Sequence, residues 1–416
     1  MKAQAAPALD LSVISIALLG ALVGLTAPTS ATEAPASIEQ VTVSGWRDPA
    51  QGPALPSELS VSGPFGSARS LADTPRAMTA VTPELMERFG VVELRDLNRV
   101  APNLYGANTF GQQSLPSIRG QLGEIFVDGL RRQGGNNGLG LPLSFNAFDQ
   151  VTVVKGPPPV VLGATQRVGG FLELAQKRPD LDTRRGELRV QGGSWDRFRQ
   201  QLDYSTPITA GVSGVRLSVE NRDEDSFYDY GRYDSQDVYL AFRHRPDGNT
   251  LLDASFEYFD VDFTDNAGWN RATQDLIDDG RYITGQGRQA NGSRVPAAGA
   301  VIKPTGSVQL PRSRTYTDPD DINGADSYAA NLHLSHRLND LWRLENRTFY
   351  QHLEREAVAR NSFVEIVDGA DTVENRIELI ADYELPLFGA ARRQQTDVGL
   401  DLRYHDVLGF SQFTTE

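Results

Sequence analysis

Residues 151–179 read VTVVKGPPPVVLGATQRVGGFLELAQKRP, and this stretch decides the fold. Two β-prone apolar runs, 151–155 and 160–162, flank a glycine and three prolines, and a third apolar run follows a pair of glycines. Prolines and glycines at such offsets mark a chain that turns sharply several times. The stretch therefore predicts short strands joined by tight turns, and it ends in a basic Lys-Arg-Pro at 177–179.

The composition excludes several classes of protein. The 416 residues carry a net charge of -14, which argues against nucleic acid as a partner because nucleic-acid-binding proteins present basic patches. The chain has no cysteine, so it holds neither a disulfide nor a thiolate metal site. A mean hydropathy of -0.37 argues against a multi-helix membrane protein. It is compatible with a membrane β-barrel, whose strands alternate polar and apolar residues.

The sequence holds no catalytic constellation. It has no Gly-x-Ser-x-Gly, no His-Glu-x-x-His and no phosphate loop ending in Gly-Lys-Ser/Thr. The glycines of 156–170 lack the lysine and hydroxyl of a phosphate loop, and the three prolines remove backbone N–H donors. We therefore expect no enzyme, no catalytic residue, no cofactor and no resident metal.

The N-terminal segment predicts export followed by a docking strand. Residues 1–31 combine Lys2, an apolar run at 11–25 and a Thr-Ser-Ala at 29–31, which indicates a cleaved secretory signal peptide. The alternative is a membrane-anchoring helix, although the run is short for a span. Residues 38–45 read IEQVTVSG and precede a proline-rich tract. An extended segment on a flexible tether suits strand addition to a partner's sheet edge, and an ordinary strand is the alternative.

Residues 70–179 predict a globular α+β domain. Thr82 can cap a short helix that begins at Pro83, and residues 94–100 predict a second helical turn or two. The pair Asp128-Gly129 between apolar runs predicts a β-hairpin.

After Pro179 the hydrophobic pattern changes to period two. About nine segments of roughly ten residues alternate polar and apolar positions, the length that spans a membrane when tilted. Their connections alternate between short ones such as 246–249 and long ones such as 265–326. Outer-membrane barrels have short periplasmic turns and long extracellular loops, so the pattern predicts an antiparallel transmembrane β-barrel. A soluble β-sandwich is the alternative.

Taken together, these features resemble the TonB-dependent outer-membrane receptors of the siderophore branch. The resemblance to the receptors rests on Ile-Arg-Gly at 118–120, Val-Asp-Gly at 127–129 and the turns of the opening stretch. The likeness to the siderophore branch rests on Lys-Arg-Pro at 177–179 and Gly-Ser-Trp-Asp-Arg at 193–197. It implies a plug scaffold of Arg119, Gly120, Asp128, Gly129, Gly156, Pro157, Gly163, Gly169 and Gly170. The chain departs from the family's pattern at Glu173 and Gln176, where asparagine and threonine are common.

The resemblance also implies the organisation of the chain. We expect a signal peptide at 1–31, a TonB-box segment and linker at 32–69, a plug domain at 70–179 and a partial barrel at 180–416. The fold class is then an α+β plug followed by an antiparallel transmembrane β-barrel in a Gram-negative outer membrane. Such receptors bind scarce nutrients, most often ferric siderophores, and import them when the periplasmic protein TonB pulls the N-terminal box. The implied partners are TonB, outer-membrane lipid and a ferric siderophore or similar ligand. The implied TonB box is Glu39, Gln40, Val41, Thr42 and Val43.

Candidate substrate-binding residues lie on the plug loops and on the long loops of the barrel. Aromatic rings with a few cations suit an anionic chelate that bears aromatic groups. For the tyrosines, the alternative is an aromatic girdle at the membrane interface. The candidates are Tyr105, Phe110, Gln112, Arg131, Arg132, Asn136, Asn137, Tyr228, Tyr230 and Trp269. Haem, a sugar or another metal complex is an alternative ligand, and a secreted β-rich binding protein without transport is an alternative function.

The predicted barrel has fewer strands than the family's. Plugged transporters of this kind have about 22 strands, and about nine are predicted here. An open half-barrel would leave unpaired strand edges in lipid. Our hypothesis is therefore that the chain is an N-terminal fragment or an early-stopped product of a longer receptor.

Overall fold

The computed structural model describes residues 60–61, 69–70, 74–106, 108–109, 112–113, 115–132, 143–163, 167–264, 273–285, 304–359, 363–387 and 390–413. All of them belong to one compact unit, Gly45–Glu416. The predicted signal peptide and TonB box lie outside the described residues.

The plug region contains a five-stranded sheet whose order is β10-β9-β12-β11-β3. Its strands are β3 (Ala77–Val81), β9 (Glu124–Val127), β10 (Leu130–Arg131), β11 (Phe148–Lys155) and β12 (Gly170–Gln176). The pair β12–β9 is parallel, and the other pairs are antiparallel. Both faces of the middle strands are covered: Val151, Val153, Leu172 and Leu174 on one face are fully buried, and Thr152 and Glu173 on the other are 2% and 3% exposed.

Short helices and strands complete the plug region. Helix α2 (Pro83–Phe89) has the predicted cap, because the Thr82 hydroxyl accepts a hydrogen bond from the Leu85 N–H. The 3-10 helix η2 (Leu94–Arg99) is the second predicted helical segment. The remaining elements are η4 (Val160–Leu162), β1 (Ser60–Val61), β2 (Arg69–Ser70), β4 (Leu104–Tyr105), β5 (Asn108–Thr109), β6 (Gln112–Gln113), β7 (Ser117–Ile118) and β8 (Gln121–Leu122).

Backbone crowding explains the paired glycines of the opening stretch. A Cβ at Gly169 would lie 2.3 Å from the Gln121 carbonyl oxygen, and a Cβ at Gly170 would lie 2.3 Å from the Val154 carbonyl oxygen. The predicted hairpin is also present: Leu130 pairs with Val127, and both central residues, Asp128 and Gly129, have positive φ.

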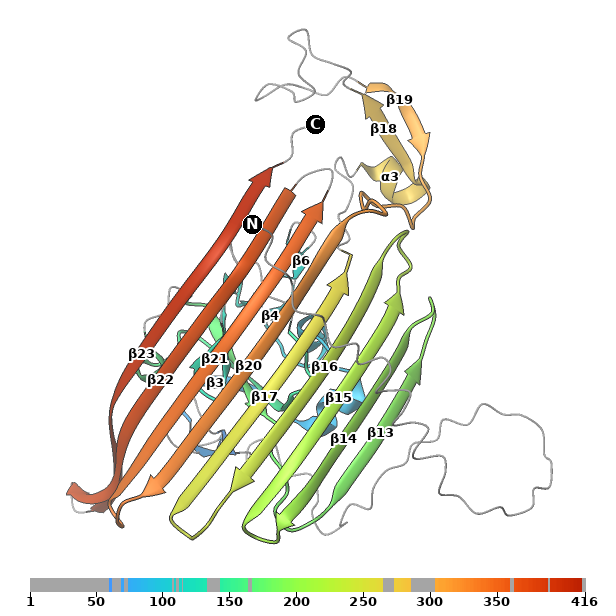
Figure 1. Ribbon diagram of the computed structural model, residues 1–416. Helices are drawn as coiled ribbons and strands as arrows, with labels where there is room; N and C mark the ends of the chain where they lie inside the picture. Colours follow the sequence, from blue (N-terminus) through green and yellow to red (C-terminus); the bar gives the residue numbers. More distant parts are fainter. Residues whose placement is uncertain are drawn as a thin grey trace, which may run out of the picture. The chain divides into compact units, whose positions relative to one another are not determined.

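A second sheet of nine antiparallel strands follows, and we call it the wall. Its strands stand in sequence order, as predicted (Figure 1). They are β13 (Arg185–Gly192), β14 (Phe198–Thr209), β15 (Ser213–Asp225), β16 (Arg232–His244), β17 (Thr250–Phe263), β20 (Ile322–Arg337), β21 (Trp342–Ala359), β22 (Phe363–Leu387) and β23 (Ala390–Phe413). Strands β13 and β23 are its two edges, so over the described residues the barrel does not close.

The long connection between β17 and β20 carries structure of its own. Its described parts contain helix α3 (Gln274–Asp279) and a hairpin of β18 (Arg281–Gly285) and β19 (Pro304–Gln309). Among the helices of the described residues, none has the length and apolar character needed to span a membrane.

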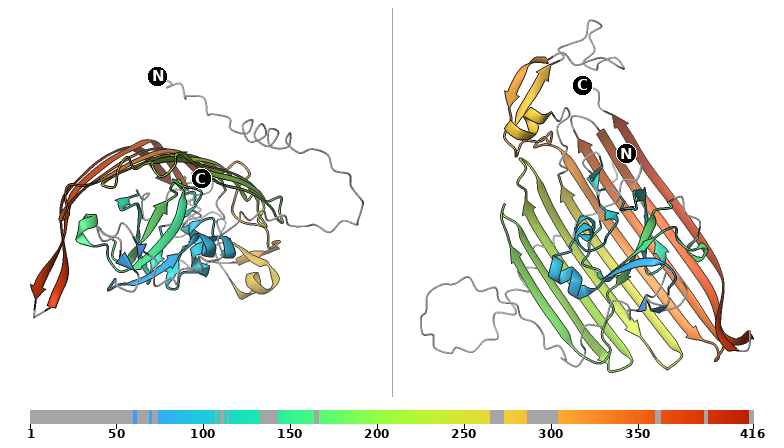
Figure 2. Two further views of the ribbon diagram at one scale, coloured as in Figure 1. Left: turned by 90° about the horizontal axis from the view of Figure 1, so that it is seen from below. Right: turned by 180° about the vertical axis from the view of Figure 1, so that it is seen from behind.

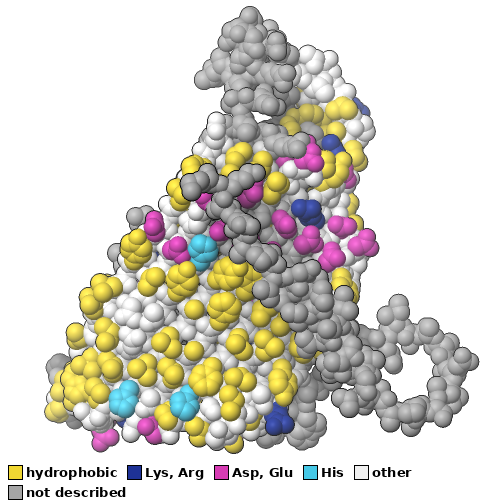
Figure 3. Space-filling model, in the orientation of Figure 1, with side chains coloured by type: hydrophobic (Ala, Val, Ile, Leu, Met, Phe, Trp, Pro, Cys, Tyr) yellow, Lys and Arg dark blue, Asp and Glu magenta, His cyan; other side chains and the backbone are white. Residues whose placement is uncertain are grey.

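The wall is curved, and the plug sheet lies on its concave side (Figure 2). On the outer side, apolar side chains such as Leu400, Leu402 and Tyr404 are 57%, 61% and 64% exposed. Hydrophobic side chains cover much of this side, and acidic ones gather toward one end of the strands (Figure 3). On the concave side, charged side chains such as Glu257 and Arg376 are buried. This is the alternation expected of a plugged barrel.

Candidate functional site

The hairpin turn between β9 and β10 is held from several directions. Arg178 forms ion pairs with Asp128 of the turn and with Asp253 of the wall strand β17. The Gly129 carbonyl accepts a hydrogen bond of 2.9 Å from Arg376 of β22, and the Arg131 carbonyl accepts one of 2.8 Å from Arg403 of β23. Charged donors from two wall strands, and Arg178 at the end of the plug, therefore fix this turn.

Asn146 fixes the plug at a second point, and sequence reasoning missed it. Its side-chain nitrogen donates to the Ser218 carbonyl at 3.1 Å and to Asp237 Oδ1 at 3.0 Å. Its side-chain oxygen accepts from the Ser218 hydroxyl at 2.7 Å and from Gln201 Nε2 at 2.9 Å. Asn146 is 1% exposed, so strands β14, β15 and β16 satisfy a buried amide that belongs to the plug.

Ion pairs fix the exit of the plug to the first wall strands. Lys177 Nζ lies 2.6 Å from Asp203 Oδ2 and donates to the Ser218 hydroxyl at 2.9 Å. Arg216 bridges Asp203 and the plug residue Asp149, at 2.8 and 2.7 Å. Lys177 is buried, so loss of its carboxylate partner would leave an uncompensated charge, which typically costs about 3–5 kcal/mol. The Arg216–Asp149 pair contributes less, because Asp149 is 37% exposed.

Glu173 is a buried carboxyl at the centre of the plug. It is 3% exposed, and its Oε1 accepts a hydrogen bond of 2.7 Å from the Gly129 N–H. Burial raises the pKa of Glu173 well above its ordinary value, and the neighbouring Asp128 raises it further. The Gly129 N–H and the guanidinium groups of Arg347 and Arg376 act in the opposite direction.

This carboxyl makes the stability of the plug depend on pH. Above its ordinary pKa of 4.5, the unfolded chain releases a proton that folded Glu173 retains. The free energy of unfolding then falls as pH rises, by up to about 1.4 kcal/mol per pH unit, until the folded group ionises too.

We expect Glu173→Gln to remove this slope and to be more stable than the parent at pH 7. Urea unfolding from pH 4 to pH 8 measures the free energy of unfolding of both proteins. Glu87→Gln, at an exposed position, is the control and should keep the pH dependence of the parent. Parallel curves for parent and Glu173→Gln would contradict the assignment.

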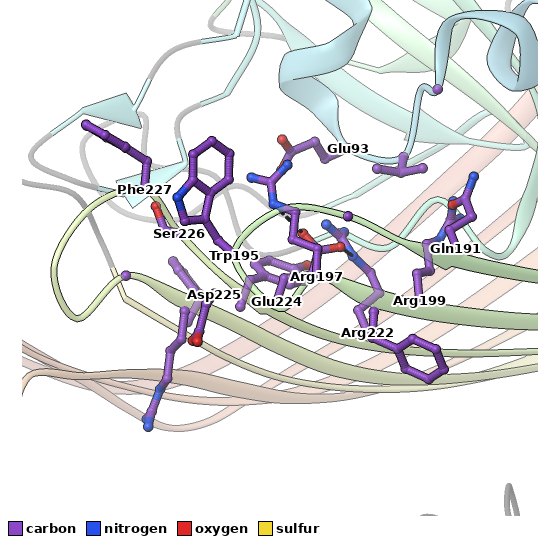
Figure 4. A pocket seen from close by; sticks show the side chains of 18 of the residues that line it. Glu93, Gln191, Trp195, Arg197, Arg199, Arg222, Glu224, Asp225, Ser226 and Phe227 are labelled. Atoms are coloured by element: carbon purple, nitrogen blue, oxygen red, sulfur yellow. Dashed lines mark hydrogen bonds and ion pairs between the residues drawn. The ribbon is translucent and has the colours of Figure 1, made fainter. Parts of the chain in front are cut away.

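A cavity of about 650 Å³ lies between η2 of the plug and the first strands and loops of the wall. Figure 4 shows Glu93 of the plug on one side and Arg197, Arg222 and Glu224 of the wall region opposite. Aromatic rings line one part of it: Trp195 and Phe227 meet edge to face with ring centroids 6.0 Å apart. The cavity therefore combines guanidinium groups with flat apolar surfaces.

The loops around this cavity hold strained residues. Trp195 and Asp196 both have positive φ in the turn between β13 and β14, and Tyr230 has it in the loop between β15 and β16. A bulky residue with positive φ costs free energy and persists where the surroundings impose it. The second loop is fastened to the long connection, because Asp229 N–H donates to the Ser313 carbonyl at 2.9 Å. This contact fixes the loop that carries Tyr230, and the Asp225 N–H donates to the Trp195 carbonyl at 3.2 Å, which ties the first turn to the end of β15.

The structure separates the predicted substrate residues into groups. Tyr228 lines the cavity, and Tyr230 lines a smaller hollow of about 450 Å³ beside it. Tyr105 is 62% exposed, and Arg131 lies 5.8 Å from the Phe126 ring centroid. Gln112 lies on strand β6. Phe110, Asn136, Asn137 and Trp269 lie outside the described residues.

Arg132, which the sequence placed among the plug-loop candidates, is buried: it is 6% exposed and lies 3.5 Å from Glu257 of the wall. It continues the hairpin ladder, because the Arg132 N–H donates to the Ile125 carbonyl at 2.8 Å. Among the described residues, no group of three or more His, Cys, Asp or Glu side chains could hold a metal ion.

Comparison with known proteins agrees with this architecture. Residues 70–170 match the family model described as the TonB-dependent Receptor Plug Domain. The metal-pseudopaline receptor CntO of Pseudomonas aeruginosa is 25% identical over 365 residues, which are 86% of this chain and 46% of the relative. The ferripyoverdine receptor of the same species is 30% identical over 205 residues, 48% of this chain and 24% of the relative. The chain thus spans about half the length, or less, of these relatives.

Solved structures show the same fold. The siderophore receptor PiuA from Acinetobacter baumannii has a TM-score of 0.66 and 18% sequence identity, over 85% of this chain and 49% of that one. The ferripyoverdine receptor of the Pseudomonas aeruginosa outer membrane, bound to ferripyoverdine, has a TM-score of 0.61 over 85% and 45% of the two chains. Residues 70–170 thus form a TonB-dependent receptor plug domain, and the chain as a whole is similar to TonB-dependent receptors of the Gram-negative outer membrane.

Proposed function

We propose that the chain is the plug and the first wall strands of a receptor that imports a ferric siderophore. The observation that carries this proposal is the plug itself, seated on the concave side of the wall through buried polar contacts such as those of Asn146 and Arg178. The ferripyoverdine receptor and other relatives are named for siderophores, which supports this ligand class.

The polar character of the interface suits a plug that moves. Ion pairs and hydrogen bonds between plug and wall can be exchanged for bonds to water, whereas an apolar interface would expose its surface when opened. Glu257 and Asp237 also lie here, each with an oxygen atom that has no protein hydrogen-bond partner in the described structure. We infer that the interface holds the plug at rest and tolerates its displacement during import.

The energy for displacement would come from TonB. In this proposal, residues 39–43 add as a strand to the sheet edge of TonB, and lipid covers the apolar outer side of the wall.

A second ligand class has its own support. CntO, which matches 86% of this chain, is named for metal-pseudopaline rather than for an iron complex. A chelate of a metal other than iron is therefore the second candidate, ahead of haem and sugars.

Uptake measurements distinguish these ligands. We expect deletion of the gene that encodes this chain to reduce uptake of one ⁵⁵Fe-labelled siderophore from a panel at least tenfold under iron limitation, and a plasmid copy to restore it. If the deletion strain instead loses uptake of a ⁶³Ni or ⁶⁵Zn chelate and keeps its iron uptake, the ligand is the chelate of a metal other than iron. Unchanged uptake of every labelled chelate would contradict both.

A further inference from the structure

The wall strand β16 carries a buried carboxyl group that the plug covers. Asp237 is 1% exposed, and its Oδ1 accepts a hydrogen bond of 3.0 Å from Asn146 Nδ2 of the plug. Ser144, the next polar side chain of the plug, lies beside the same carboxyl group. Asp237 Oδ2 has no hydrogen-bond partner within the described part of the chain. The plug therefore encloses Asp237 and satisfies only one of its two oxygens.

The acidic neighbours of Asp237 already have their cations. Glu220 of β15 stands directly opposite Asp237 in the sheet register, and Arg199 pairs with Glu220 at 2.5 Å. Glu257 of β17 is 1% exposed, and Arg132 of the plug lies 3.5 Å from its Oε2. Each of these two carboxylates thus faces one guanidinium group.

No described lysine, arginine or histidine forms an ion pair with Asp237. Lys177, another plug cation on this side of the wall, lies 2.6 Å from Asp203 and donates to the Ser218 hydroxyl. Three carboxyl groups, those of Glu220, Asp237 and Glu257, therefore meet two guanidinium groups. If all three were ionised, one buried negative charge would remain uncompensated.

A proton removes this charge at the least cost. A buried carboxylate without a cation loses its hydration and gains nothing in return, so such a group takes up a proton instead. The two ionised neighbours add repulsion in the same direction. Once protonated, Asp237 becomes a donor, and Glu257 Oε1 on the adjacent strand is an acceptor that lacks a partner among the described residues. Glu257 pairs with Tyr239, which makes it a diagonal neighbour of Asp237 across the two strands.

We propose that Asp237 is a proton-binding site that the seated plug completes, and that it releases its proton to water when the plug leaves. Displacement of Asn146 and Ser144 would open the carboxyl group to the solvent, where an aspartate ionises above about pH 4. The plug then reseats only after Asp237 has taken a proton back. The proposal goes beyond import, because it concerns the seating of the plug and holds for whatever ligand the receptor carries.

Infrared spectroscopy of the 416-residue chain, refolded in detergent micelles, detects the bound proton directly. A protonated carboxyl group has a C=O band that an ionised one lacks. Carbon-13 at the aspartate carboxyl groups shifts the band of a protonated aspartate and leaves that of a protonated glutamate in place. We expect a protonated aspartate at pH 7 in the parent and its loss in Asp237→Asn. Asp340→Asn, in the exposed turn between β20 and β21, is the matched control and should keep the band.

A single thiol measures the release of the proton. The chain has no cysteine, so Ala147→Cys places one thiol beside Asn146 in the plug. Ala147 is 0% exposed, so a thiol reagent reacts there only when the plug opens. The labelling rate, divided by that of the urea-unfolded chain at the same pH, gives the open fraction. We expect this fraction to rise from pH 6 to pH 8 more steeply than in the chain that also carries Asp237→Asn. The difference should reach up to about tenfold per pH unit, because one proton is lost on opening.

Two results would overturn the proposal. One is the absence of a protonated aspartate in the labelled parent, and this measurement decides the matter even where Asp237→Asn fails to refold. The other is an equal pH dependence of opening with and without Asp237→Asn. A missing infrared band, together with an unfolding temperature that rises on addition of Na⁺ or Ca²⁺, would assign the site to a metal cation and contradict the proton. Loss of chelate uptake on gene deletion bears on the import proposal and leaves this one unchanged.

Discussion

Asn146→Asp is expected to unseat the plug and to lower the free energy of unfolding by about 3 kcal/mol or more. The substitution replaces the nitrogen that donates to the Ser218 carbonyl and to Asp237 by an oxygen that accepts. Each buried acceptor left without its donor costs about 1–3 kcal/mol. The new carboxylate would also join the buried acidic side chains around Asp237, where like charges repel.

Limited trypsin digestion and urea unfolding of the refolded chain measure this effect. The plug should become cleavable while the wall strands stay protected in micelles. Asn249→Asp makes the same chemical change in the exposed turn between β16 and β17 and should behave like the parent. Parent-like digestion of Asn146→Asp would show that the buried amide does not fix the plug.

Thr42→Pro is expected to abolish energised uptake and to leave ligand binding at the cell surface unchanged. Residues 39–43 are proposed to pair as a strand with TonB, and proline removes the backbone N–H that such pairing uses. A break in the coupling would lower uptake at least tenfold, because the plug would no longer be displaced. The substitution lies far in sequence from the plug, so the affinity for ligand should not change.

Labelled-chelate binding at 0 °C and uptake at 37 °C, measured in the same cells, separate the two effects. Ser57→Pro, in the proline-rich tract between the box and the plug, is the matched control and should transport normally. Normal uptake by Thr42→Pro would place the coupling segment elsewhere in the chain.

Local chemistry made much of the fold predictable. Thr82 followed by Pro83 marks a helix start wherever it occurs, and Asp128-Gly129 between apolar runs marks a hairpin. The change to period two after residue 179 indicated a wall of about nine strands because one face meets lipid and the other meets the plug. In each case the residues that determine the element are close together in the sequence.

The contacts between plug and wall could not be predicted in the same way. Alternation shows that Arg216 and Glu257 face inward, but it does not show which plug residue each one meets. Asn146 lies 72 residues from Ser218 and 91 residues from Asp237, and nothing near it in the sequence marks an anchor. Arg95 and Arg222 line one cavity only because the plug packs against β15, and Arg132 meets Glu257 only because the plug packs against β17.

The position of β3 has a mechanical consequence. This strand is the edge of the plug sheet, pairs with β11 from Ala77↔Lys155 to Val81↔Val151, and is the sheet strand nearest the N-terminus. A force that pulls the chain from that side, away from the sheet, acts first on the Ala77–Lys155 pair. The backbone hydrogen bonds of the five β3–β11 pairs then break one pair after another. Peeling these five residues frees about 16 Å of chain before tension reaches α2, the next element along the chain, while β11 begins two residues after the anchor at Asn146. The edge strand β3 is therefore the first part of the plug sheet to yield to a pull from the N-terminal side. The buried polar contacts between plug and wall bear the load only after this strand has detached.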